Sequence, residues 1–163
     1  MSGVLASVDK RTQLVGENRL ELLLFYLHSR HLFALNVFKV KEVVKLPQIS
    51  KIPHAHPKVS GVVNIRGESI PVIDLRRAIN MPEAKHIEDT NLVITEYNRT
   101  VQGFLIGKVD QIINMTWSDI MPPPTAIGKN HYLTALTKVK RDGQEQLVEI
   151  IDVEKVLAEI VEY

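Results

Sequence analysis

A hairpin signal in the middle of the chain constrains its fold more than any other feature. Two runs rich in β-branched residues, 62–65 and 70–73, flank a four-residue link that begins at Arg66. Such runs joined by a short polar link are typical of a β-hairpin, and Gly67 can take the positive φ that a tight turn often needs. Alternation along a strand predicts Asn64 and Arg66 on one face, with the aliphatic residues on the other.

An asparagine and an arginine on an aliphatic hairpin have two interpretations. Arginine presents five donors in a rigid geometry, so the hairpin could display a recognition surface. Alternatively, the Arg66 stem covers apolar surface while its charged head stays in water. The local sequence alone favours the second interpretation.

Further strand and turn signals recur along the chain. Strands are predicted over 20–27, 32–37, 91–97, 101–109, 111–116, 132–139 and 146–151. Residues 38–44 fit either a short helical turn or a continued strand. Asp142-Gly143 between the last two strands is a strong hairpin turn signal. About nine or ten short strands in hairpin order favour an antiparallel all-β fold with closed or nearly closed barrels.

Helical signals are few and short. Residues 4–18 contain apolar residues at a helical spacing and predict a short amphipathic helix. Asp74 is expected to cap a helical turn over 75–79, and Asp152 an amphipathic helix over the last residues of the chain.

Composition excludes several functional classes. The chain has no cysteine, which excludes disulfides, thiolate zinc sites and cysteine nucleophiles and favours a reducing compartment. The longest apolar run, 22–27, is too short to cross a bilayer, and the first 19 residues lack the apolar core of a secretory signal. We therefore expect a cytoplasmic protein of one domain, or of two small intertwined subdomains, in 163 residues.

The net charge of +1 hides an uneven distribution. Residues 39–77 hold eight Lys or Arg and three acids, a net charge of +5, whereas residues 78–163 hold eight basic and thirteen acidic residues. A basic segment can bind nucleic acid or an acidic protein surface. Its lysines are spaced out and are not interleaved with aromatic residues, which gives a nucleic-acid groove little support.

Chemical motifs are weak. No nucleotide-binding or hydrolase motif is present. His54 and His56 could face one metal, but their position between prolines favours a surface loop. The remaining histidines sit beside turns and are expected to be exposed; they are His28, His31, His86 and His131. Trp117 is expected to fill the core rather than to anchor a partner. No cofactor or metal is predicted, and a binding module is at least as well supported as an enzyme.

An ordered set of blocks supplies a more specific signal. The segment 61–67, followed by 70–76, closely resembles the signature of CheW-like chemotaxis adaptor domains. Supporting blocks occur in the family's order at 33–43, 91–94, 103–110, 120–123 and 132–136. The resemblance covers roughly residues 20–160, which is nearly the whole chain.

The beginning of the chain resembles one type within this family. Segments 4–9, 11–16 and 18–25 are similar to the start of CheV, in which an adaptor domain precedes a phosphorylatable receiver domain. No receiver-like pattern follows the helix predicted after Asp152. We divide the chain into an N-terminal helical segment, 1–19, and a CheW-like adaptor domain, 20–163.

The resemblance implies both a fold and a function. The fold would be mainly all-β, with two intertwined five-stranded SH3-like β-barrels, a short N-terminal helix and a C-terminal amphipathic helix. The protein would be a non-catalytic adaptor without a cofactor, linking chemoreceptors to the regulatory domain of the histidine kinase CheA. It would act in the cytoplasm, at receptor arrays on the inner face of the membrane.

The family's receptor-binding positions map onto individual residues of this chain. They match Val40, Glu42, Gly61, Asn64 and Arg66. Kinase-docking residues cannot be singled out from the sequence. A small-barrel nucleic-acid-binding protein that uses residues 39–77 remains the alternative function.

Overall fold

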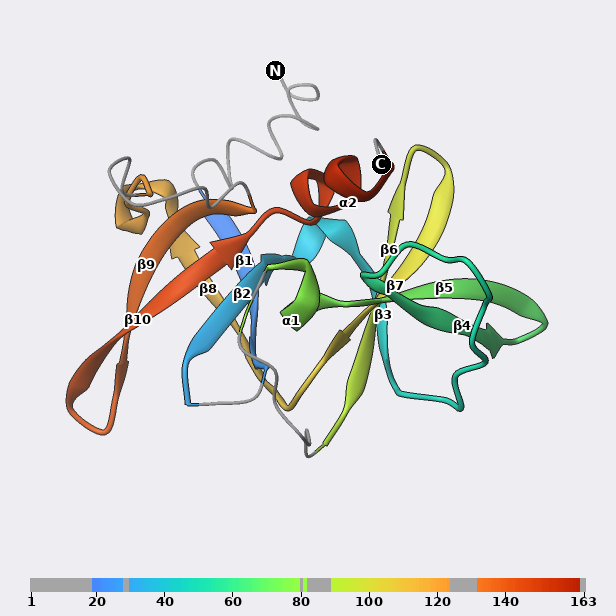
Figure 1. Cartoon of the computed structure of the whole chain (residues 1–163). Helices are drawn as coiled ribbons and strands as arrows, with labels where there is room; N and C mark the ends of the chain where they lie inside the picture. Colours follow the sequence, from blue (N-terminus) through green and yellow to red (C-terminus); the bar gives the residue numbers. More distant parts are fainter. Residues whose placement is uncertain (1–18, 28–29, 80, 82–88, 124–131, 162–163) are drawn as a thin grey trace, which may run out of the picture.

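Ten strands and a few short helices make up the computed structural model, which describes residues 19–27, 30–79, 81, 89–123 and 132–161 (Figure 1). The strands are β1 (Arg19–Tyr26), β2 (Leu32–Asn36), β3 (Val40–Lys45), β4 (Val59–Ile65), β5 (Glu68–Asp74), β6 (Asn91–Tyr97), β7 (Thr100–Ile106), β8 (Val109–Thr116), β9 (Leu133–Arg141) and β10 (Gln144–Ile151). The helical elements are η2 (Val37–Lys39), α1 (Leu75–Ala78), η3 (Trp117–Asp119) and α2 (Val153–Val161). The helix predicted over 4–18 lies outside the described residues.

The strands form two five-stranded sheets, in the orders β8-β1-β2-β10-β9 and β3-β6-β7-β5-β4. The first sheet takes its strands from both ends of the chain and the second from the middle, so the two units are intertwined. This confirms the predicted mainly-β class. The strictly antiparallel expectation is wrong, because β2 pairs with β10, and β5 with β7, in parallel. Each parallel pair joins strands of different hairpins, whose relative direction no turn signal fixes.

Three hairpins share one type of turn. Both residues of each turn have positive φ, at Arg66-Gly67, Asn98-Arg99 and Asp142-Gly143. Turns of this kind match the right-handed twist of the strands they join. The prediction for Gly67 is confirmed. The prediction for Arg66 needs correction, because this residue lies in the turn, with φ of 51°, and not on the strand face that carries Asn64.

Each sheet curls until it is nearly closed. After the edge strand β3 the chain turns back, and Ser50 pairs with Val62 of the opposite edge strand β4. In the other sheet, Met121 follows the edge strand β8 and pairs with Leu136 of β9. The residues 38–44 combine both predicted alternatives, since a 3-10 turn leads directly into β3.

Alternating side chains divide the interior into three cores. Leu22 and Leu24 of β1 point into the first sheet's own core, whereas Leu23 and Phe25 point into a core shared by both sheets. Strands of the second sheet divide their side chains in the same way between its own core and the shared core. Two buried faces explain why residues 22–27 are apolar throughout.

In the second sheet the short helix α1 follows β5, and in the first sheet α2 follows β10. Both helices help to cover the shared core. Asp74 caps α1 by accepting from the Arg76 amide at 3.0 Å, and Asp152 caps α2 by accepting from the Glu154 amide at 2.9 Å. Both predicted caps are confirmed. The surrounding sequences, Val-Ile-Asp-Leu and Ile-Ile-Asp-Val, are alike, and in each sheet the helix follows a strand of the parallel pair.

Candidate functional site

An ion pair joins the opposite edges of the second sheet. Glu42 lies on the edge strand β3, and its carboxylate accepts from the guanidinium of Arg66 in the β4–β5 turn. The two side chains meet because the sheet curls. The Arg66 side chain is 70% exposed, so its remaining donors face solvent and are accessible to a partner.

Asn64 holds the turn that presents Arg66. Its side-chain oxygen accepts from the Gly67 amide at 3.1 Å. The oxygen of the Asn64 side chain therefore fixes the backbone of the turn. The nitrogen of the same side chain can still donate to a partner, because Asn64 is exposed. A turn held in this way loses little conformational entropy when a partner binds Arg66.

Gly61 serves the closure of the sheet. It is buried, with φ of 150°, and a Cβ at this position would lie 2.3 Å from the Ser50 carbonyl oxygen and 2.7 Å from Ile49 Cγ2. Only glycine lets the 49–50 segment approach β4 this closely. The close approach that Gly61 permits is therefore to the chain's own backbone.

Val40 lies two residues before Glu42 and packs partly against the shared core. The structure therefore brings Glu42, Asn64 and Arg66 together at the hairpin tip, with Val40 farther along β3. Gly61 lies in the wall of the same sheet. The five residues share one sheet but not one pocket.

Two aromatic residues on the 3-10 turns are exposed, Phe38 before β3 of the second sheet and Trp117 after β8 of the first sheet. Sequence reasoning did not single out Phe38. Phe38 is 88% exposed on η2, where the Asn36 side chain accepts from its amide at 2.9 Å. Trp117 is 54% exposed, so its expected place in the core is wrong. Thr116 and Asp119 form a capping box that turns the chain at η3 and displays the indole. The Thr-x-x-Asp spacing was the available signal.

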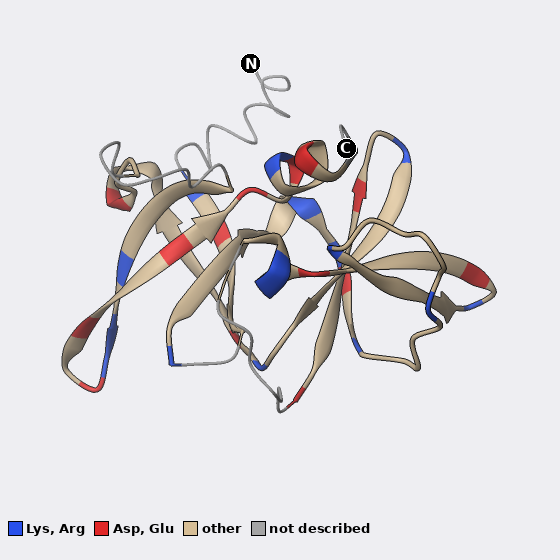
Figure 2. Ribbon diagram, in the orientation of Figure 1, with Lys and Arg blue, Asp and Glu red and all other residues tan. Residues whose placement is uncertain are grey.

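The basic segment 39–77 is largely paired with acids. Its ion pairs are Lys39–Glu154, Lys41–Glu96, Lys45–Asp89, Lys58–Glu159, Arg66–Glu42, Arg76–Asp74 and Arg77–Asp74. Figure 2 shows blue and red segments side by side over the second sheet rather than one basic face. Most of the net charge of +5 is offset by the acidic half of the chain, which disfavours the nucleic-acid alternative.

The histidines that the structure describes form no metal site. Among the described residues, no three His, Cys, Asp or Glu side chains are grouped closely enough to hold a metal ion. His54 is exposed and His56 half-buried, as expected for a surface loop. His31 is not exposed as predicted, because it is half-buried and its Nε2 lies 2.5 Å from Glu149 Oε2. His28, His86 and His131 lie outside the described residues.

The helices of the described segments are all too short or too polar to span a membrane.

Comparisons with known proteins identify the family. A family model described as the CheW-like domain matches residues 21–161. The chemotaxis protein CheW of Bacillus subtilis (strain 168) is 28% identical over 137 residues, covering 84% of this chain and 86% of that protein. The Helicobacter pylori chemotaxis protein CheV1 is 30% identical over 176 residues, covering 98% of this chain but 54% of that protein, so the chain spans about half its length.

A solved structure has the same fold. The crystal structure of the scaffolding protein TtCheW from Thermoanaerobacter tengcongensis is similar with a TM-score of 0.71 and 28% sequence identity. The match covers 82% of this chain and 88% of that one.

Proposed function

This chain belongs to the CheW-like domain family, and from that membership we propose that it joins the tips of chemoreceptors to the regulatory domain of the histidine kinase CheA. It is a CheW-like chemotaxis scaffolding protein, and the family is non-catalytic. Its contribution to signalling is then to bind two partners at once and to hold them in a fixed relative position.

We assign receptor binding to the second sheet. Arg66 and Glu42 would recognise polar groups on the receptor's helices, and Asn64 would hold the turn that presents them. Val40 would add apolar contact area on the same strand. Gly61 would act indirectly, by allowing the sheet to close. The strongest support is Arg66 itself, a highly exposed guanidinium whose position is fixed by Glu42 and by a capped turn.

Phe38 extends this surface toward the first sheet. An amphipathic helix binds through apolar anchors spaced along one face, and exposed aromatic residues are frequent anchors in interfaces. Phe38 lies two residues before Val40 and presents nearly its whole ring to solvent. In the free protein this apolar ring is exposed to water, which is unfavourable, and a receptor helix would bury it.

Two finer assignments follow from the same proposal. We place the protein at the cytoplasmic face of receptor arrays, because only there can it contact both partners. We also propose that the chain is the adaptor part of a CheV-type protein. The match to CheV1 supports this, since it extends over 98% of the chain and thus includes residues before β1.

The test is a pair of binding measurements on the full chain. A labelled receptor-tip peptide and the CheA regulatory domain are titrated separately with the parent, Arg66→Ala and Arg99→Ala. Arg99 is a matched control, because it is an exposed arginine in a hairpin turn of the same type, between β6 and β7. We expect Arg66→Ala to weaken receptor binding by about 1–3 kcal/mol and to leave kinase binding unchanged. Equal receptor affinities for all three proteins would refute the assignment of Arg66.

A further inference from the structure

A second candidate binding site lies at the beginning of β4. There the loop after β3 and the short helix α1 line an open cavity of about 460 Å³. Four of its lining residues are basic, namely Lys51, His54, His56 and Arg77. None of the described residues that line it is acidic. The described lining therefore carries positive charge at Lys51 and Arg77 and contributes no carboxylate of its own.

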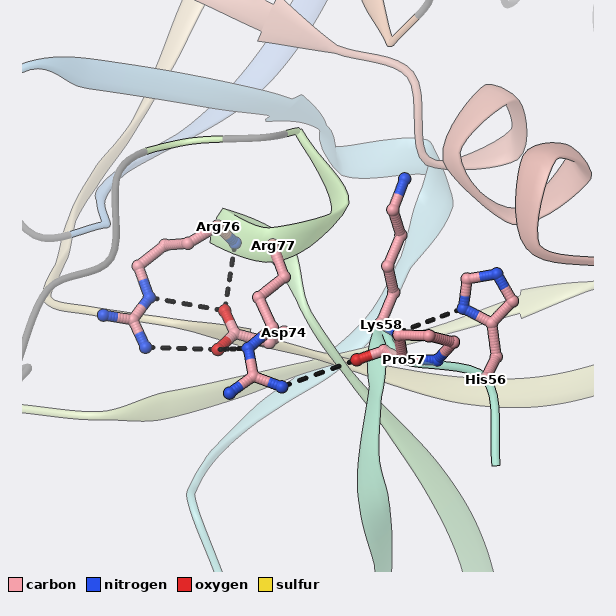
Figure 3. A network of polar contacts seen from close by, with 6 residues as sticks. All are labelled: His56, Pro57, Lys58, Asp74, Arg76 and Arg77. Carbon is pink, nitrogen blue, oxygen red and sulfur yellow. Dashed lines mark hydrogen bonds and ion pairs between the residues drawn. The ribbon is translucent and has the colours of Figure 1, made fainter. Parts of the chain in front are cut away.

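The carboxylate beside Arg77, that of Asp74, is already occupied. Asp74 receives two hydrogen bonds from the Arg76 guanidinium, at 3.3 and 3.1 Å, and a third from the Arg76 amide (Figure 3). Arg77 Nε lies 4.0 Å from the same carboxylate, at the limit of an ion pair, and its side chain is 56% exposed. Of the two neighbouring arginines, Arg76 is thus neutralised whereas Arg77 retains donors for a ligand.

The wall of the cavity is preformed. The Val59 amide donates to the His56 carbonyl at 2.8 Å, and the Lys58 amide donates to His56 Nδ1 at 3.0 Å. Arg77 donates to the Pro57 carbonyl at 3.4 Å (Figure 3). A wall held by these bonds needs little reorganisation to accept a ligand.

The rest of the lining selects the kind of ligand. Ile49, Ile52 and Val59 give the cavity an apolar part, and the Ile52 side chain is 42% exposed. Among the described lining residues there is no aromatic ring on which a nucleic-acid base could stack. The same residues include no glycine, unlike the backbone nests that commonly cradle phosphate groups. The lining fits carboxylates attached to an apolar body.

We propose that this cavity binds an acidic segment of a partner protein, with carboxylates at Lys51 and Arg77 and an aliphatic side chain against Ile49 and Ile52. The site is separate from the one assigned to receptors. Seven residues of β4 and its turn separate Val59 from Arg66, which at about 3.3 Å per residue is on the order of 20 Å. The chain would thus hold a contact beyond the receptor site.

The test is a titration of the isotopically labelled full chain, followed by backbone amide NMR shifts. The probe is the blocked peptide Glu-Leu-Glu-Leu-Glu, with Gln-Leu-Gln-Leu-Gln as the uncharged control peptide. We expect shifts centred on residues 51–60 and a dissociation constant of about 1 mM for the acidic peptide only. The double variant Lys51→Gln/Arg77→Gln should weaken binding about tenfold or more.

A second double variant removes the same charge elsewhere. Lys138→Gln/Lys140→Gln changes two exposed lysines of β9, in the other sheet, and should leave the affinity within about twofold. The proposal is overturned if the acidic peptide causes no shift at 51–60, or if both double variants lose affinity equally. It is likewise overturned if the uncharged peptide, inorganic phosphate or a single-stranded oligonucleotide binds the same residues as tightly as the acidic peptide.

Discussion

Arg66 and Glu42 form an ion pair that joins the two edges of one curled sheet, although 24 positions separate them in the sequence. Both side chains remain accessible, with 70% and 35% of their surfaces exposed. Exposed ion pairs contribute little to folding, so the pair is better suited to orienting Arg66 than to stabilising the sheet.

Replacing Glu42 shows whether its ion pair orients Arg66 or stabilises the fold. We expect Glu42→Gln to change the free energy of unfolding by less than about 1 kcal/mol, because the pair is solvated. Receptor-tip affinity should fall by about 0.5–1.5 kcal/mol, since Arg66 must then be ordered on binding. Urea unfolding and fluorescence anisotropy measure the two quantities. A loss of unfolding free energy well above 2 kcal/mol would show that the pair is structural after all.

Gly61 should be far less tolerant of substitution than Gly67. Gly61→Ala would place a Cβ against the Ser50 backbone and impose an unfavourable φ, so we expect a loss of about 2–4 kcal/mol. Gly67→Ala also has an unfavourable φ, of 84°, but meets no atom within 4 Å, and should cost about 1 kcal/mol. Thermal or urea unfolding of both variants checks the difference. Equal losses would contradict a role for Gly61 in closing the sheet.

The two capping aspartates differ in what else they hold. Asparagine caps helices about as well as aspartate, so Asp152→Asn should cost less than about 0.5 kcal/mol. Asp74→Asn keeps the cap but removes the charge that pairs with Arg76, and both side chains of that pair are largely buried. We expect a loss of about 2–4 kcal/mol in unfolding free energy. If both variants were equally stable, the contact between Asp74 and Arg76 would contribute nothing to the free energy of unfolding.

His31 should make stability depend on pH. Its hydrogen bond to Glu149 raises the pKa of the imidazole above 6.5, partly opposed by burial, and the nearby negative charge adds to the rise. A pKa raised by folding means that the charged form stabilises the fold below the unfolded value. This stabilisation is lost as the pH rises through the folded value.

Urea unfolding between about pH 6 and about pH 8.5 follows this loss. The parent should lose stability over that range, and His31→Asn should lose less. His54→Asn is the control, because His54 is exposed in a loop and forms no ion pair with any residue that the structure describes. Parallel pH profiles for the parent and His31→Asn would exclude the contribution.

Local features of the fold could be predicted from the sequence because neighbouring residues determine them. The turn at Asp142-Gly143 and the cap at Asp74 depend on a few adjacent positions, and both are confirmed. The parallel pairing of β2 with β10 depends on strands more than 100 residues apart, so no local pattern encodes it. Trp117 is exposed beside the capping box of Thr116 and Asp119, a local pattern that the prediction of a core position did not take into account.

The residues of the proposed site came from the family resemblance, but their geometry did not. The resemblance to the CheW-like family supplied Glu42 and Arg66, whereas local physics favoured a passive arginine. Neither indicated that the two side chains contact each other, because that contact requires the curl of the whole sheet. The same curl gives Gly61 its close contact with Ser50.

The most direct test of the coupling function is whether the chain recruits the kinase to receptors. Membranes carrying a chemoreceptor are mixed with CheA and with the parent, Arg66→Ala or Arg99→Ala, and the CheA that sediments with the membranes is measured. The parent and Arg99→Ala should increase sedimented CheA severalfold over membranes without the chain, and Arg66→Ala should not. If CheA sedimented equally with and without the chain, coupling by this protein would be contradicted.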